Sequence, residues 1–386
     1  MPRGKRTALV LSGGGVRGAY EVGAVKGILE VLGVKRTDPA PFHIFTGTSV
    51  GAINATYLAA HADRGDMAID GLVQLWTSLE VSEYARFDAF ASLRRRRDSS
   101  FSSGWSLIDP KPLARLVSRG IPFDRLHENR RRGIVDSLVI AALDIAYSRT
   151  TMFAQVADDA QFRPSMDPLR NAVLTNIELD HVLASAALPF VFPARRIGDS
   201  YYCDGGLRYN TPIAPAIRSS ADELVIIPAI RAGGPRRPAA PLGRYPNLTF
   251  MAGKLVNALL ADPVERDLAI LERFNRLVGV LDAALTDDER DRVADVFLET
   301  RGHDYRHLDV LTVRPTIDIG EMAGARIKEG VGGAIGWLLR QVLRRSGSDE
   351  ADWASYVLFD GRFAEQLIEV GRQDSYALAD DIRAFF

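Results

Sequence analysis

The sequence has few of the residues that build disulfides, metal centres or membrane spans. It contains one cysteine and six histidines in 386 residues, without the spacing of a metal site. A single cysteine excludes an internal disulfide and gives no sign of an oxidising compartment. No run approaches the roughly 18 apolar residues that would cross a bilayer. These absences lead us to expect a cytoplasmic protein that uses no metal or other cofactor.

The chain also has no large excess of charge of either sign. The formal net charge is −1, which provides no global electrostatic attraction to nucleic acid. Hydrophobic residues make up 47% of the chain and charged residues 25%, both within the range of globular domains. We therefore expect a globular protein without a nucleic-acid partner.

Glycine, in contrast, is abundant, and its clusters carry the strongest signals. The pentapeptide Gly47–Gly51 reads G-x-S-x-G and follows an apolar run at residues 42–45. Glycines beside a serine permit a tight strand-to-helix turn, because they remove the Cβ atoms that would clash there. The helix expected from residue 50 onward would direct its N-terminus and its free N–H groups at Ser49. The pattern indicates a serine nucleophile, although 33 glycines also allow a chance match.

A second glycine cluster follows a strand-like apolar run near the start of the chain. Its Gly13, Gly15 and Gly18 fit the dinucleotide pattern G-x-G-x-x-G, which also requires a carboxylate at the end of the second strand. Asp38 has about the right spacing, but it precedes that strand. The alternative is a backbone cradle for an anion, and beside a nucleophilic serine such a cradle is an oxyanion hole. We favour the oxyanion hole and keep dinucleotide binding as the weaker interpretation.

The third cluster is Asp204-Gly205-Gly206, at the end of another strand-like run. On its own it could be an ordinary Asp-Gly-Gly turn. A Ser-His-Asp triad would need a later histidine, which His303 or His307 could supply in the chain order of α/β-hydrolases. Both histidines lie in a charged stretch typical of a solvated surface, and the proposed nucleophile follows only the second strand. These features argue against a Ser-His-Asp triad.

Together these segments resemble the patatin-like phospholipase family. The resemblance rests on the GGG-x-R-G loop, the G-x-S-x-G elbow and the D-G-G turn, in that order along the chain. Two further blocks support it, A-S-A-A-L-P-F-V-F-P at residues 184–193 and D-G-G-L-R-Y-N-T-P at residues 204–212. The resemblance covers residues 5–230 and departs from the family at no catalytic position.

The resemblance implies a lipid acyl hydrolase that cleaves carboxylic esters of phospholipids or lysophospholipids through an acyl-serine intermediate. Ser49 and Asp204 would form a Ser–Asp dyad, with Ser49 as the nucleophile and Asp204 as its base. The oxyanion hole would comprise Gly13, Gly14 and Gly15. The supporting positions would be Arg17, Gly18, Gly47, Gly51, Gly205 and Gly206. Arg17 could contact an anionic head group or fix the loop through a salt bridge, and both roles stay open. A catalytically weak lipid-binding or regulatory protein is the alternative function.

Strand and helix patterns alternate through the first 230 residues. We predict strands at 6–11, 42–46, 134–144, 150–157, 195–203 and 223–229, and helices at 16–32, 50–62, 66–79, 110–119, 178–187 and 212–219. Such alternation predicts an α/β fold, a mostly parallel sheet covered by helices on both faces. The resemblance implies the family's three-layer sandwich, here with additional C-terminal helices.

The remaining chain predicts the domain organisation. We expect an acyl hydrolase domain at 1–345, with a catalytic core at 5–230, a Gly/Pro/Arg-rich loop at 231–247 and a mainly helical part at 248–345. Within that part we expect a helical break at Asp262-Pro263, a late strand at 308–314 and a helix at 325–345. A helical extension at 346–386 would follow, formed of short helices.

A lipid ester substrate implies contact with a lipid surface. Arg94–Arg97 lie between aromatic and apolar residues, and could dock peripherally on anionic lipid at about 1 kcal/mol per charge. The alternative is a set of solvated arginines balanced by nearby acids. Peripheral membrane contact is therefore a hypothesis alongside the cytoplasmic location.

Overall fold

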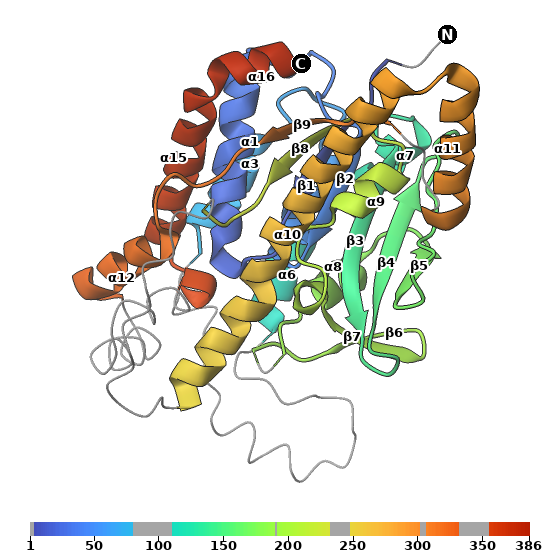
Figure 1. The fold of residues 1–386 in the computed structure, drawn as a ribbon. Helices are drawn as coiled ribbons and strands as arrows, with labels where there is room; N and C mark the ends of the chain where they lie inside the picture. The colour runs from blue at the N-terminus through green and yellow to red at the C-terminus, as the bar shows by residue number, and fades with distance from the viewer. Residues whose placement is uncertain (1–3, 80–109, 190, 232–247, 302–305, 332–354) are drawn as a thin grey trace, which may run out of the picture.

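The computed structural model describes residues 4–79, 110–189, 191–231, 248–301, 306–331 and 355–386 (Figure 1). Within them the chain forms a nine-stranded sheet in the order β5-β4-β3-β2-β1-β8-β9, with β7 beside β3 and β6 beside β7. The strands are β1 (Thr7–Leu11), β2 (Ile44–Thr48), β3 (Ser137–Asp144), β4 (Arg149–Val156), β5 (Arg170–Leu174), β6 (Arg195–Ile197), β7 (Ser200–Asp204), β8 (Glu223–Ile227) and β9 (Asp309–Thr312).

The central strands of this sheet are parallel. β3, β2, β1, β8 and β9 run in the same direction, whereas β4 is antiparallel to β3 and carries β5 parallel to itself. The hairpin β6–β7 joins β3 in the antiparallel sense. The predicted α/β class, with a mostly parallel sheet, is confirmed.

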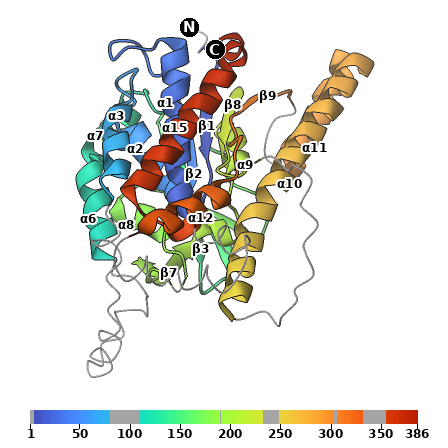
Figure 2. The same ribbon diagram turned by 90° about the vertical axis from the view of Figure 1, so that its left-hand side faces the viewer.

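Helices cover both faces of the sheet (Figures 1 and 2). Leu9 and Leu11 of β1 belong to the core beneath the helices of one face, whereas Ala8 and Val10 belong to the core beneath α9 and α10, as the period of two along a strand requires. The helices are α1 (Gly18–Leu32), α2 (Val50–Ala60), α3 (Ile69–Thr77), α6 (Lys111–Gly120), α7 (Phe123–Arg131), α8 (Leu179–Ser185), α9 (Ile213–Arg218), α10 (Leu248–Ala284), α11 (Asp287–Arg301), α12 (Ile319–Gly330), α15 (Gly361–Ala377) and α16 (Ala379–Phe385).

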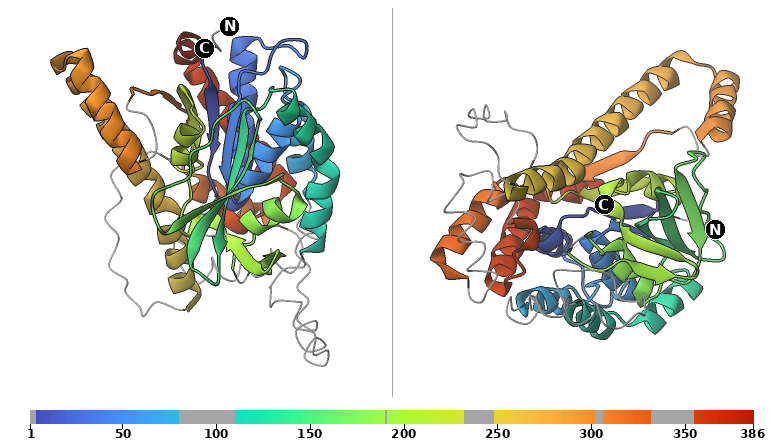
Figure 3. Two further views of the ribbon diagram at one scale, coloured as in Figure 1. Left: turned by 90° about the vertical axis from the view of Figure 1, so that its right-hand side faces the viewer. Right: turned by 90° about the horizontal axis from the view of Figure 1, so that it is seen from below.

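Several predicted elements differ from the structure. The single strand expected at 195–203 is the hairpin β6–β7, which turns at Gly198 with φ 59°. The break expected at Asp262-Pro263 is wrong, because α10 continues through it and projects past the sheet with α11 (Figure 3). A proline removes one helical hydrogen bond, which a long helix can tolerate. Strand β5 and helix α7 were not predicted.

The predicted helix at 325–345 is only partly described. Helix α12 begins at Ile319, before the expected start, and ends at Gly330. Residues 332–345 lie outside the described residues, as do Arg94–Arg97 and the predicted loop from residue 232 onward.

The C-terminal helices share the core of the sheet domain. Helix α15 packs on α1 so closely that a Cβ on Gly23 would lie 1.9 Å from the Ile368 carbonyl oxygen. Phe363 and Leu367 of α15 are fully buried in the same cluster as Leu9. The helices of 355–386 are confirmed, and α15 is longer than expected. The boundary at residue 345 stays a prediction, and the packing makes α15 part of the support for α1.

Candidate active site

Two strands meet end to end along one edge of β3, and their meeting point defines the site. β2 pairs with β3 up to Thr48, which lies opposite Ala141. The antiparallel β7 then takes over at the next residue, where Asp204 lies opposite Ala142. The chain therefore leaves the sheet at Ser49, beside the position where β7 ends with Asp204.

The two predicted dyad residues are in direct contact there. The Ser49 hydroxyl donates a hydrogen bond to Oδ2 of Asp204 at 2.6 Å. Ser49 has φ 55° and ψ −124°, a backbone conformation that is costly for a residue with a Cβ atom. The turn is this tight because Gly47 and Gly51 touch each other, and a Cβ on Gly47 would lie 2.3 Å from the Gly51 carbonyl oxygen. Strain of this kind is a feature of nucleophile elbows.

Asp204 is almost completely shielded from solvent. Its side chain is 1% exposed, and its Oδ1 accepts a hydrogen bond from the Gly206 N–H at 2.7 Å. Burial raises the pKa of Asp204 to about 6, against the opposing effect of the hydrogen bonds from Ser49 and Gly206. Gly205 and Gly206 thus bring the backbone against the carboxylate, as the D-G-G pattern suggested. A carboxylate with this pKa is a better proton acceptor than an exposed one.

The glycine loop lies beside the serine. β1 and β2 are in register with Leu11 opposite Gly47, so the loop after β1 adjoins the elbow. The Gly13 N–H donates to the Asn210 carbonyl oxygen at 3.1 Å, which leaves the amides of Gly14 and Gly15 as the remaining predicted oxyanion donors. Within the described part of the chain, the N–H of neither glycine donates a hydrogen bond to another protein group. The loop then turns through Gly15, whose φ is 58°, into α1.

Arg17 is buried, and its guanidinium contacts residues near the C-terminus. It is 4% exposed, and its Nε and Nη2 donate to the Ser355 hydroxyl at 2.8 and 2.5 Å. Its guanidinium also stacks on the Tyr356 ring, 3.9 Å from the centroid. Of the two roles left open by the sequence, this placement favours fixing the loop. Gly18 begins α1 directly behind it and packs against Val50 of the elbow helix.

Ser185 is a site residue whose role was not predicted from the sequence. Its hydroxyl accepts the Ser49 N–H at 2.9 Å and donates to the Ala141 carbonyl oxygen at 2.6 Å. Two residues later, the Ala187 carbonyl oxygen accepts the Asp204 N–H at 2.9 Å. The end of α8 therefore contacts all three strands at the point where β2 and β7 meet on β3. Its only signal was its place in the A-S-A-A-L-P block.

A second unpredicted residue lies beneath the glycine loop. The fully buried Glu21 accepts hydrogen bonds from the Ser12 N–H at 2.8 Å and from Asn54 Nδ2 at 3.0 Å. Burial raises the pKa of Glu21 to about 8, although its hydrogen bonds oppose the rise. The Ser12 hydroxyl in turn accepts the Ala229 N–H at 3.0 Å. This network ties the base of the loop to α1, α2 and the chain after β8.

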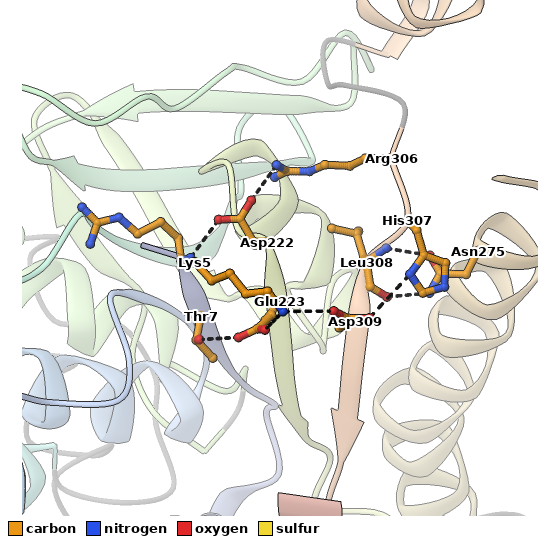
Figure 4. A network of polar contacts seen from close by, with 10 residues as sticks. Lys5, Thr7, Asp222, Glu223, Asn275, Arg306, His307, Leu308 and Asp309 are labelled. Atoms are coloured by element: carbon orange, nitrogen blue, oxygen red, sulfur yellow. Dashed lines mark hydrogen bonds and ion pairs between the residues drawn. The ribbon is translucent and has the colours of Figure 1, made fainter. Parts of the chain in front are cut away.

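The alternative histidine base, His307, whose surroundings are drawn in Figure 4, lies at the other end of the sheet. His307 precedes β9, is half exposed, and has its Nδ1 3.6 Å from Asp309 Oδ1, beside the ion pair of Lys5 with Glu223. β9 runs in the same direction as β2, so a strand of roughly 15 Å separates it from the elbow. His307 therefore cannot complete a triad with Ser49. The other alternative, His303, lies outside the described residues.

The described residues offer no metal site and no membrane span. No three histidine, cysteine, aspartate or glutamate side chains among them are grouped to hold a metal ion. In the same parts of the chain, no helix has both the length and the apolar character needed to cross a bilayer.

A serine on a strained strand-to-helix turn, hydrogen-bonded to a buried carboxylate beside a glycine loop, is compatible with a serine hydrolase. The family model of patatin-like phospholipases matches residues 9–217, more than half of the chain. The protein belongs to this family of lipid hydrolases.

Distant likenesses to solved structures accompany the family match. VipD from Legionella pneumophila is 13% identical with a TM-score of 0.37, over 98% of this chain and 67% of VipD. Human GIVD cytosolic phospholipase A2, solved in complex with methyl gamma-linolenyl fluorophosphonate, is 11% identical with a TM-score of 0.39. That match covers 98% of this chain and 58% of the human protein. No curated protein matches the sequence.

Proposed function

We propose that the protein hydrolyses carboxylic esters of phospholipids or lysophospholipids through a Ser49–Asp204 dyad. The observation that carries this proposal is the 2.6 Å hydrogen bond from the Ser49 hydroxyl to a buried carboxylate. Because the carboxylate is the direct partner of the serine, with no imidazole between them, we assign Asp204 as the base of the reaction.

In the first half of the reaction, Ser49 Oγ forms a bond to the ester carbonyl carbon while its proton moves to Asp204 Oδ2. The carbonyl electron pair moves onto the oxygen, and the amides of Gly14 and Gly15 stabilise this oxyanion. When the tetrahedral intermediate collapses, the bond to the alcohol oxygen breaks. The leaving alcohol takes the proton from Asp204, and the acyl group stays on Ser49.

In the second half, water attacks the acyl-serine ester and gives a proton to Asp204. The bond between the acyl carbon and Ser49 Oγ breaks, the fatty acid leaves, and Ser49 regains its proton from Asp204. Each proton that Asp204 accepts is therefore returned within the same half-reaction. A pKa of about 6 suits this exchange near neutral pH, because the group is ionised and still basic.

The assignment of substrate class can be tested by product analysis. Phosphatidylcholine and lysophosphatidylcholine, each presented in detergent micelles, would be incubated with the protein, and released fatty acid would be measured by mass spectrometry. We expect release from at least one of the two lipids, together with the matching deacylated product. A protein that only binds lipid would co-sediment with vesicles of the same phospholipid and release no fatty acid.

The pH dependence of the reaction follows from the burial of Asp204. Only the ionised carboxylate can accept the Ser49 proton, so kcat/KM for a soluble nitrophenyl ester should rise between pH 5 and pH 7. The rise should follow an apparent pKa of about 6, the value that burial gives Asp204. A rise centred near 4, the range of an exposed carboxylate, would contradict a desolvated base.

Ser185→Ala tests how strongly the junction of the two strands holds the nucleophile. The variant leaves the Ser49 N–H and the Ala141 carbonyl without their shared partner, so kcat should fall about 10- to 100-fold at nearly unchanged KM. Ser375→Ala is the matched control, because Ser375 is an equally buried serine that bonds the carbonyls of Ala24 and Gly371, away from the site. Equal losses of Tm with unchanged kcat in both variants would show that Ser185 only supports the fold.

A further inference from the structure

A segment near the C-terminus lies directly against the glycine loop. The Tyr356 carbonyl oxygen occupies the space where Gly15 would carry a Cβ, 2.0 Å from that position. Gly15 has φ 58°, so the residue combines a left-handed backbone with a close backbone contact. The family model matches residues 9–217, and residues 355–360 lie more than a hundred residues after the end of that match. The loop of the family's core is therefore completed by a later part of this chain.

Side chains strengthen this contact. Arg17 donates two hydrogen bonds to the Ser355 hydroxyl and stacks on the ring of Tyr356. Ser355 and Tyr356 are buried, so these interactions are shielded from water. Hydrogen bonds from a charged group under such conditions are worth more than those at the surface. Arg17 belongs to the short turn that joins Gly15 to α1, so the contact acts on the loop itself.

The segment is anchored on its far side as well. Asp360 accepts the Phe363 N–H at the start of α15 and pairs with Arg326 of α12, with Arg326 Nε 2.9 Å from Asp360 Oδ1. The Gly361 N–H donates to the Leu79 carbonyl oxygen at 2.8 Å. Helix α15 then packs along α1. Residues 355–360 are thus held between α12, α15 and the chain after α3, which gives them the rigidity to support a loop.

We propose that Ser355 and Tyr356 are positioning residues that hold the Gly14 and Gly15 amides in the orientation needed to bind the oxyanion. The inference rests on the proposed function of this loop. β1 and the Glu21 network fix the start of the loop, and Ser355 and Tyr356 fix its other side through Gly15 and Arg17. A loop without this support would still bind substrate, but it would stabilise the transition state less well. The effect should therefore appear in kcat and leave KM nearly unchanged.

The test compares Ser355→Ala and Tyr356→Ala with the conservative variant Tyr356→Phe, which keeps the ring that stacks on Arg17. We expect kcat for a soluble nitrophenyl ester to fall about 10- to 100-fold in the two alanine variants, because a displaced oxyanion donor should cost less than a lost one. Tyr356→Phe should restore activity close to that of the wild type. Arg372→Ala is the control, because its side chain pairs with Glu30 and links α15 to α1 away from the loop.

Hydrogen exchange of the peptide containing residues 12–22 provides a second readout that does not depend on turnover. The alanine variants should exchange faster there than the wild type, whereas Arg372→Ala should not. Unchanged exchange, or faster exchange with unchanged kcat, would overturn the proposal. A wild type that hydrolyses no ester would instead refute the proposed function, and the exchange measurement would still show whether the segment supports the loop.

Discussion

Replacing Ser49 with alanine is expected to abolish ester hydrolysis while the protein stays folded. Among the described residues at the elbow, this hydroxyl is placed to attack a carbonyl carbon and to pass its proton to Asp204 at 2.6 Å. Loss of a serine nucleophile should lower kcat at least about 10³-fold, because the remaining oxyanion donors act on water alone. Fatty-acid release from phospholipid micelles measures the effect. Alanine keeps the same strained backbone, so Tm should change little.

Ser220→Ala is the matched control for this variant. Ser220 also has a positive φ, 63°, but it precedes β8 at the opposite end of the sheet from the elbow. The control removes a hydroxyl from another serine with a positive φ and should keep full activity. A Ser49→Ala protein that retains more than a tenth of wild-type activity would show that another residue is the nucleophile.

Asp204→Asn is expected to have the second largest effect, and it should act on activity and stability in opposite directions. The amide fits the same space and can still accept the Gly206 N–H, but it cannot take the proton of Ser49. We expect kcat to fall about 10²- to 10⁴-fold, the usual contribution of a general base. Kinetics with a soluble ester at pH 8 measure this loss.

The same substitution should stabilise the fold at alkaline pH. The pKa of Asp204 rises from 3.8 to about 6 on folding, so the unfolded chain loses its proton first and stability falls as pH rises through this window. Above it, the buried charge costs about 3 kcal/mol, which the neutral amide avoids. Tm of Asp204→Asn should therefore exceed that of the wild type at pH 8 and match it near pH 4. Asp144→Asn is the control, because it changes a different buried carboxylate, at the end of β3, and it should keep full activity.

The core of the site could be predicted from the sequence because its backbone demands are local. A serine between Gly47 and Gly51, and an aspartate before Gly205, each report a tight approach within a few residues. These patterns, through the family resemblance that they carry, predicted that Ser49 and Asp204 act together. The strands and helices around them also follow from local alternation, so the fold class was predictable.

The residues that support the site depend on pairings that are distant in sequence. Ser185 acquires its role because β2 and β7 meet on β3, and neither register is visible in a single sequence. Gly13 was predicted to bind the oxyanion, but its N–H bonds to Asn210, almost 200 residues later. Tyr356 contacts Gly15 across more than 300 residues. The continuous helix α10 was missed for a different reason, because its proline indicates a break only by local preference.

Covalent labelling with a fluorophosphonate, followed by intact mass and peptide mapping, tests the Ser49–Asp204 dyad most directly. We expect one adduct on the wild type, located on Ser49, with none on Ser49→Ala and a strongly reduced rate on Asp204→Asn. Labelling should also slow below pH 6, where Asp204 holds a proton. An adduct on a different residue, or undiminished labelling of Asp204→Asn, would contradict the dyad.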